Sequence, residues 1–297
     1  MIAPRIRRLF FLLLALPMVL ISSATLKAQD STHIDGGRVA LVSGALIGTV
    51  VAVHIYQADA WWQGQQQPFR FANDWEYALN IDKLGHMYGG YSESRLAQAT
   101  LGWIGFDEKT SLFYGSVIGL SYQLYVEVED GFHKEYGFSP GDGFSDIMGA
   151  SIPLAQTAFP VLQNFTLKFS YWPSQNYLNE LKQQQFHVFI DDYEGQTFWL
   201  GIDPHFLMGE HLAESVPPWL GIAIGEGAHG LENLGDPTRL YYLTLDYNFS
   251  KIPTSSAFLH TALSALDFFH LPAPGFAIED GKFEAGIFYC YHVKVTL

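Results

Sequence analysis

The chain has 297 residues, of which 48% are hydrophobic, 15% aromatic and only 15% charged. This length allows one large domain or two modest ones with a sizeable core, and the low charge content favours a membrane-associated or envelope protein over an ordinary cytosolic one. The formal net charge is −14 at pH 7. Because this surface repels nucleic-acid backbones and the sequence has no basic stripe, we expect no nucleic-acid partner.

The N-terminal segment has the layout of a secretory signal peptide. Three arginines among the first eight residues precede an apolar run at residues 9–21, and small residues follow as far as Ala28. We therefore expect residues 1–28 to be removed, with an uncleaved membrane anchor as the alternative. Cleavage removes four cations and no acid, which changes the formal charge from −14 to −18. No cysteine lies near the cleavage point, so we expect no lipoprotein anchor there.

Apolar segments rich in small residues predict a helical first half. The segment 39–56 contains no Asp, Glu, Lys or Arg. Its length is marginal for spanning a bilayer, and a buried helix of a soluble bundle is an equally supported alternative. Trp61 and Trp62 follow it, as aromatic residues do at a membrane interface or in a soluble core. Further helices are expected at about 82–104, 110–129 and 142–163.

The second half has the period-two alternation of β-strands. One segment with helical spacing, 255–270, interrupts the strands and stops before Pro272. The expected strands lie at 165–172, 197–203, 219–228, 239–249 and 283–295. We therefore predict an α+β protein with a signal peptide at 1–28, a bundle of about four apolar helices at 29–164, and an antiparallel β region at 165–297 with an inserted helix near 255–270.

Ionisable residues gather at the ends of the predicted helices. Asp82 and His86 are four residues apart and share a helix face, while Lys83 is expected to point away from that pair. Glu127 and Asp130 are three residues apart at the C-terminal end of the next helix, where the helix dipole disfavours acids. Their position therefore suggests that another group compensates for their charge.

A third helix end completes the predicted cluster. Ser139 or Asp142 can cap the following helix, and Asp146 comes one turn later. An imidazole among several acids is typical of divalent-cation sites and of proton transfer, although an ordinary network of ion pairs is the alternative. The predicted polar site comprises Asp82, Lys83, His86, Glu127, Asp130, Ser139, Asp142 and Asp146, and the candidate ligands of a divalent metal ion are Asp82, His86, Glu127, Asp130 and Asp142.

These blocks carry a family resemblance. "IDKLGHMYGGYSESRL", followed by "YVEVEDGFHKEYGFSPGDGFSDIMGA", resembles an uncharacterised bacterial envelope family of YfiM-type predicted periplasmic lipoproteins, in whose larger members "DDYEGQTFWLGID" also recurs. The same skeleton is distantly similar to the VanZ-like membrane family. The resemblance covers about residues 55–205 and implies an envelope protein with several apolar helices, without a settled reaction. Asp146 departs from the family pattern, which usually has Asn there, and both the VanZ-like arginine and the lipoprotein cysteine are missing.

We expect a non-catalytic, membrane-associated protein of the cell envelope, in the periplasm or outer membrane rather than the inner membrane. It would bind a membrane lipid or other amphiphile, or a divalent cation, at a polar cluster between apolar helices. One alternative is a structural protein that contacts the outer membrane or an envelope protein partner. The other is a hydrolase acting on an envelope lipid or glycan, although the sequence contains no H-E-x-x-H or phosphate-loop motif.

Overall fold

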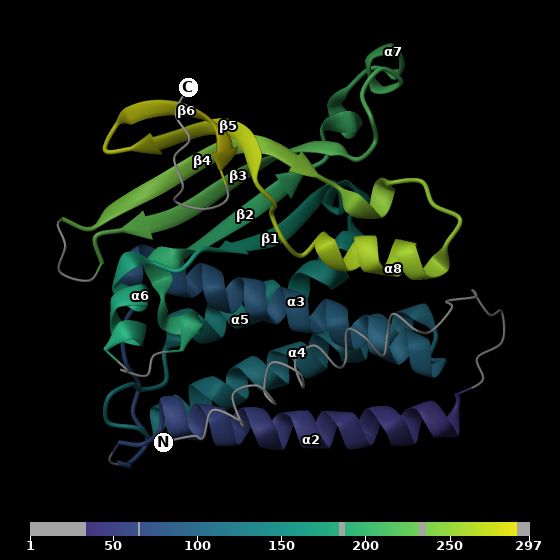
Figure 1. Cartoon of the computed structure of the whole chain (residues 1–297). Helices are drawn as coiled ribbons and strands as arrows, with labels where there is room; N and C mark the ends of the chain where they lie inside the picture. The colour runs from purple at the N-terminus through teal and green to yellow at the C-terminus, as the bar shows by residue number, and fades with distance from the viewer. Residues whose placement is uncertain (1–33, 65, 184–187, 232–235, 290–297) are drawn as a thin grey trace.

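The structure is a computed structural model that describes residues 34–64, 66–183, 188–231 and 236–289. The expected signal peptide and the last residues of the final predicted strand lie outside these ranges. Within them, a layer of helices stacks against one face of a sheet (Figure 1). Helices precede antiparallel strands along the chain, which confirms the predicted α+β class.

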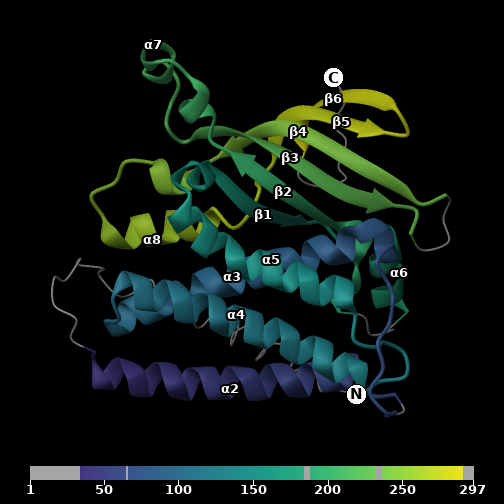
Figure 2. The ribbon, with the colours of Figure 1, turned by 180° about the vertical axis from the view of Figure 1, so that it is seen from behind.

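The first half of the chain is built from long helices with clear start signals. Asp35, Asp107 and Ser139 each accept a hydrogen bond from a backbone N–H of the first turn that follows, and Pro140 occupies the first turn after Ser139. Gly105, at φ +113°, ends one helix in the left-handed conformation that favours glycine. In chain order these helices are α2 (Gly36–Ala60), α3 (Ile81–Ile104), α4 (Glu108–Gly131) and α5 (Pro140–Ala158). Figures 1 and 2 show α3 and α5 nearest the sheet, α4 beneath them and α2 outermost.

Glycines bring three of these helices into backbone contact. A Cβ atom on Gly149 of α5 would lie 2.0 Å from the carbonyl oxygen of Met87 on α3. A Cβ on Gly119 of α4 would lie 2.7 Å from the amide nitrogen of Ser94 on α3. Side chains at these positions would force the helices apart, so the glycines set the close approach of α3, α4 and α5.

The sheet is an antiparallel meander of six strands that neighbour one another in chain order. The strand over residues 273–279 was not predicted, because its Ala-Pro-Gly start hides the alternation. The described part of the last strand ends at Tyr289, so residues 290–295 of that prediction lie outside the described residues. The strands are β1 (Phe165–Tyr171), β2 (Gln196–Ile202), β3 (Leu220–His229), β4 (Thr238–Tyr247), β5 (Ala273–Glu279) and β6 (Lys282–Tyr289).

Shorter helices occupy the connections of the second half. After α8 (Ala257–Leu266) the chain returns to the edge of β1, where the amide of Phe169 donates to the carbonyl of Phe268 and the amide of His270 donates to the carbonyl of Phe169, both at 3.0 Å. The sheet therefore gains an additional short pairing beside its first strand. These helices are α6 (Gln175–Lys182), α7 (Glu210–Ala213) and α8 (Ala257–Leu266).

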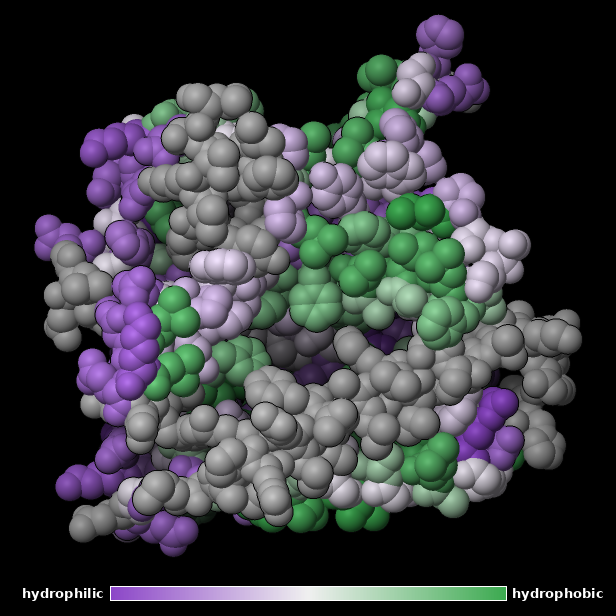
Figure 3. All heavy atoms as spheres, viewed as in Figure 1, coloured by the Kyte–Doolittle hydropathy of each residue, from purple (hydrophilic) through white to green (hydrophobic). Residues whose placement is uncertain are grey.

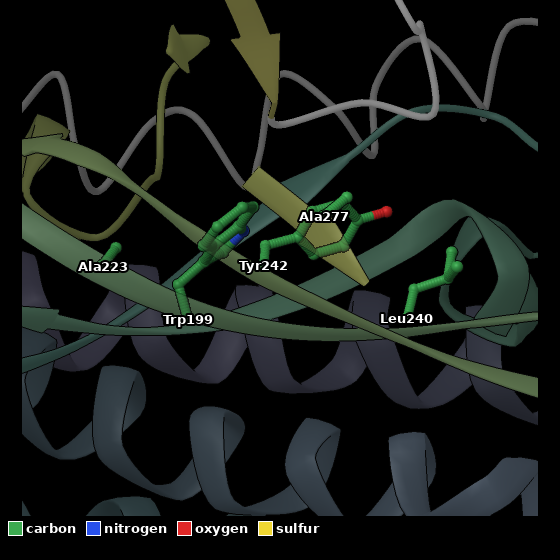
Figure 4. Close-up of a cluster of buried hydrophobic side chains, with 5 residues drawn as sticks. All are labelled: Trp199, Ala223, Leu240, Tyr242 and Ala277. Atoms are coloured by element: carbon green, nitrogen blue, oxygen red, sulfur yellow. The ribbon is translucent and has the colours of Figure 1, made fainter. Parts of the chain in front are cut away.

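The two faces of the sheet bury different cores. On the helix side, Phe198 packs with Ile81 of α3 and with Ala228. On the other side, Lys168 and Asp246 form a buried ion pair at 2.8 Å. This second face also buries the cluster drawn in Figure 4, which consists of Trp199, Ala223, Leu240, Tyr242 and Ala277.

Candidate functional site

The site begins at the first turn of α3. Ala78, Leu79 and Asn80 have φ values of 48°, 55° and 68°, and this left-handed turn leads directly into the helix. Asp82 and His86 then lie one helical turn apart on the same face, with Asp82 Oδ1 3.9 Å from His86 Nε2. The shared face that their spacing predicts is therefore present in the fold.

Three helices place carboxylates around the imidazole of His86. Its Nε2 atom lies 3.9 Å from Asp82 Oδ1, 3.7 Å from Glu127 Oε1 of α4 and 3.9 Å from Asp142 Oδ1 of α5. These separations are too long for hydrogen bonds. They suit a shared ion, because two ligand atoms that each lie about 2.0–2.2 Å from a metal are at most about 4.4 Å apart.

The other nitrogen of His86 has a direct partner. His86 Nδ1 lies 3.0 Å from Asp146 Oδ1, and the Asp146 side chain is fully buried. A carboxylate on one ring nitrogen orients the imidazole and directs the lone pair of the other nitrogen toward a metal. Asp146 Oδ2 has no hydrogen-bond partner within the described part of the chain. The sequence reasoning placed Asp146 in the cluster, but not as the residue that holds His86.

Lys83 points into the cluster, so the prediction that it turns away is wrong. Its Nζ lies 2.7 Å from Asp82 Oδ2, 2.7 Å from Asp142 Oδ1 and 3.0 Å from Asp74 Oδ1. The first turn of α3 lies beside the start of α5, and the four-carbon stem of lysine can bend back to acids there. Burial alone would lower the pKa of Lys83, but Asp82 and Asp142 outweigh it and raise that pKa.

The acid near the end of α4 is compensated by the start of α5. Glu127 Oε2 accepts a hydrogen bond of 3.0 Å from the backbone amide of Ser139. The Ser139 hydroxyl in turn accepts from the amide of Asp142 at 3.1 Å, which makes Ser139 the cap of α5. The positive pole of α5 therefore offsets the unfavourable position of Glu127 at the end of α4.

Asp130 lies apart from the atoms that surround His86. Its Oδ1 accepts a 2.7 Å hydrogen bond from Nε1 of Trp62, just beyond α2. Two compact groups of ligand atoms occur among the described residues, each with its atoms within 4.8 Å of one another, and neither contains Asp130. The structure therefore places Asp130, one of the predicted ligands, outside both groups. The groups are Asp82–His86–Asp142 and His86–Glu127–Asp146.

Burial dominates the electrostatics of the acids. It raises the pKa of Glu127 to about 8, that of Asp142 to about 7 and that of Asp130 to about 6, and it also raises the pKa of Asp146. For His86, burial lowers the pKa, but the hydrogen bond to Asp146 and the nearby acids outweigh it and raise the value to about 10. The protein thus brings acids together where their charged forms are poorly solvated.

The cluster has more acids than cations. Lys83 and His86 are its positive groups, and a bound divalent cation would offset the excess negative charge. The carboxylates that face these two side chains directly are Asp74, Asp82, Glu127, Asp142 and Asp146.

Sequence reasoning missed three polar residues of this region. Asp74 precedes α3 in a connection without periodicity, and no local signal indicates its contact with Lys83. Tyr193 donates a 2.8 Å hydrogen bond to Asp82 Oδ1 from a position 111 residues away. In the sequence, only the family resemblance of the segment DDYEGQTFWLGID drew attention to this part of the chain. Glu93 lies two turns beyond His86, where burial raises its pKa to about 8 and Gln123 donates to it at 2.9 Å.

A family described as predicted periplasmic lipoproteins (DUF2279) has a model that matches residues 69–157. This segment contains α3, α4, all of α5 but its last residue, and every residue of the cluster except Tyr193. The match supports a relationship to an uncharacterised periplasmic lipoprotein family, and it confirms the predicted export to the cell envelope. The chain has no significant match among curated proteins or among solved structures.

Proposed function

We propose that this envelope protein binds a divalent transition-metal ion at His86, between the ends of α3, α4 and α5. Asp82 and Asp142 would join His86 as ligands, Glu127 would supply the fourth ligand atom, and Asp146 would orient the imidazole. The supporting observation is the position of His86 Nε2, 3.7–3.9 Å from carboxylate oxygens of three different helices.

The donor set indicates the class of metal. An imidazole suits zinc, iron and copper, whereas carboxylates suit manganese and the harder cations. Calcium and magnesium take oxygen ligands and have no need of an imidazole. We therefore propose Zn²⁺, Mn²⁺ or Fe²⁺ as the bound ion. Its binding would stabilise the junction of α3, α4 and α5 by joining acids that otherwise repel one another.

The predicted binding of an amphiphile remains a second candidate function, because an apolar hollow adjoins the cluster. A Cβ atom on Gly141 would lie 2.6 Å from the ring of Trp75 and 3.1 Å from Cε of Lys83, so the wall of the hollow touches the polar site. An apolar chain in the hollow would place its polar end near Asp74. The similarity to the VanZ-like membrane family, which stays a prediction, would also favour an amphiphile as the ligand. The hollow is lined by Phe71, Ala72, Asn73, Trp75, Pro140 and Gly141.

Metal analysis of the purified full chain tests the main proposal. The protein is loaded separately with Zn²⁺, Mn²⁺ and Fe²⁺, freed of excess ion, and analysed by mass spectrometry of the metal content. We expect stoichiometric retention of at least one of these ions by the wild type, and its loss in His86→Ala and Asp142→Asn.

The matched control is Asp130→Asn, which removes a neighbouring, partly buried acid outside the ligand groups and should retain the metal. Circular dichroism of each variant identifies loss of fold. Absence of stoichiometric metal from the wild type, or equal retention by folded His86→Ala, would refute the proposal.

A further inference from the structure

We propose that α2 is embedded in a lipid bilayer as a membrane-spanning helix, an inference that does not depend on the metal site. Among the described helices, α2 meets the length and composition of a membrane span. Its 25 residues extend over about 37 Å at 1.5 Å per residue, which exceeds the roughly 30 Å hydrocarbon core of a bilayer.

The distribution of charge along α2 fits a bilayer. The stretch 39–58 contains no Asp, Glu, Lys or Arg, and it is about as long as the 20 residues that a span requires. Charged groups appear only at the ends, where Asp35 and Arg38 pair at 3.5 Å before the stretch and Asp59 follows it. The interior of a bilayer therefore suits the whole stretch, which has no charged face to turn to water.

The central part of α2 is exposed although it is apolar. A helix in a soluble bundle turns its apolar stripe inward. In α2, none of the most apolar window is buried, and Ile47 and Ile55 are 66% and 57% exposed. This exposure contradicts the buried-helix alternative from the sequence. The exposed apolar side chains, distributed around most of the helix circumference, are Leu41, Leu46, Ile47, Val50, Val51 and Ile55.

Polar contacts of α2 with the protein are concentrated toward its two ends. Arg38 Nη1 donates to the carbonyl of Trp103 at 2.6 Å, and near the other end His54 Nδ1 bonds to the hydroxyl of Tyr125. Figures 1 and 2 both place α2 outermost, beside α4. The middle of the helix is left for another partner, and its lack of a polar side favours lipid over a second copy of the chain.

Aromatic side chains gather where α2 ends, as they do at the interface between lipid and water. Trp62 stacks on His133 at a ring separation of 5.9 Å, but both side chains are buried in the protein, so the exposed rings beside them carry this argument. Next to His133, the exposed ring of Phe132 lies 5.2 Å from that of Phe69, which lies 5.4 Å from Phe71. This cluster marks the level at which we place the bilayer surface.

The neighbouring helix continues the apolar surface. No charged residue lies between Lys109 and Glu127 of α4. In Figure 3, hydrophobic residues are visible along the lower margin, where α2 lies. The outward side chains of α4 would therefore lie against the same lipid as α2. Those that are exposed are Phe113, Tyr114, Val117 and Ile118.

Membrane extraction of the full chain tests this proposal. Membranes carrying the wild type are washed with alkaline carbonate and then urea, and we expect most of the protein to remain in the pellet. In Ile47→Asp/Val51→Asp, two charged side chains enter the middle of the span, where an acidic residue strongly disfavours insertion into the bilayer. We expect this variant to appear mainly in the soluble fraction.

The control is Leu207→Asp/Leu212→Asp, which changes two exposed leucines far from α2 and should stay in the pellet. Circular dichroism of the soluble Asp variant shows whether it has folded, so this test stands whether or not the protein binds a metal. Release of the wild type by the washes overturns the inference, and a released wild type that migrates as a dimer assigns the α2 surface to a second copy. Retention of the Asp variant equal to that of the wild type also overturns it.

Discussion

Replacement of Gly149 by alanine should disturb both the fold and the metal site. A Cβ atom there would lie 2.0 Å from the carbonyl oxygen of Met87, whereas ordinary contacts of Cβ begin near 3.4 Å. Helices α3 and α5 would thus have to separate by about 1.4 Å, since backbone atoms cannot rotate away. The same shift would lengthen the 3.0 Å contact between His86 Nδ1 and Asp146 Oδ1 beyond hydrogen-bond range.

We expect Gly149→Ala to lower the free energy of unfolding by about 3 kcal/mol, the upper part of the range for overpacking. This loss corresponds to a drop in Tm of roughly 5 °C for a chain of this size. Loss of the Asp146 contact that orients His86 should also weaken metal binding by about 10-fold or more. Thermal unfolding in detergent and competition with a chelator measure the two effects.

The matched control is Gly102→Ala, also in a long helix, where a Cβ would meet nothing closer than the Ser111 hydroxyl at 3.9 Å. Removal of a helical glycine without a clash should leave Tm unchanged or raise it slightly. If Gly149→Ala matched this control in both Tm and metal affinity, backbone contact between α3 and α5 would not be what positions His86.

Two further predictions concern the second half of the chain. Lys168→Met should cost about 3–5 kcal/mol because it leaves Asp246 buried without its partner, whereas Lys168→Met/Asp246→Leu should recover most of this loss; equal denaturation midpoints for the single and double variants would contradict this. Burial lowers the pKa of His270 to about 3, so below its unfolded value of 6.5 the unfolded chain binds the proton and stability falls as the pH drops toward 3. His270→Phe should remove this contribution, so the difference in free energy of unfolding between the wild type and this variant should shrink by up to about 2 kcal/mol as the pH falls from 7 to 5. Parallel pH profiles of the two proteins in urea denaturation would argue against a neutral buried imidazole.

In the helical half, the sequence alone predicted the features that depend on residues close together along the chain. Asp82 and His86 share a face because four residues make about one helical turn, and this local geometry needs no partner helix. Ser139 caps α5 because its hydroxyl, just before Pro140, can accept a hydrogen bond from the backbone amide of Asp142. Helices with apolar residues at their characteristic spacing were likewise predictable. The predictions that proved wrong or incomplete concern contacts between different helices.

Tertiary structure alone decided which polar groups meet. Lys83 turns inward because the start of α5 brings Asp142 within 2.7 Å, and Tyr193 reaches Asp82 across 111 residues of sequence. Asp130 is three residues from Glu127 and shares its helix face. Its carboxylate nevertheless bonds to Nε1 of Trp62 and lies apart from the atoms around His86. These outcomes depend on how closely backbones approach at positions such as Gly149, a distance that residue spacing within one helix does not encode.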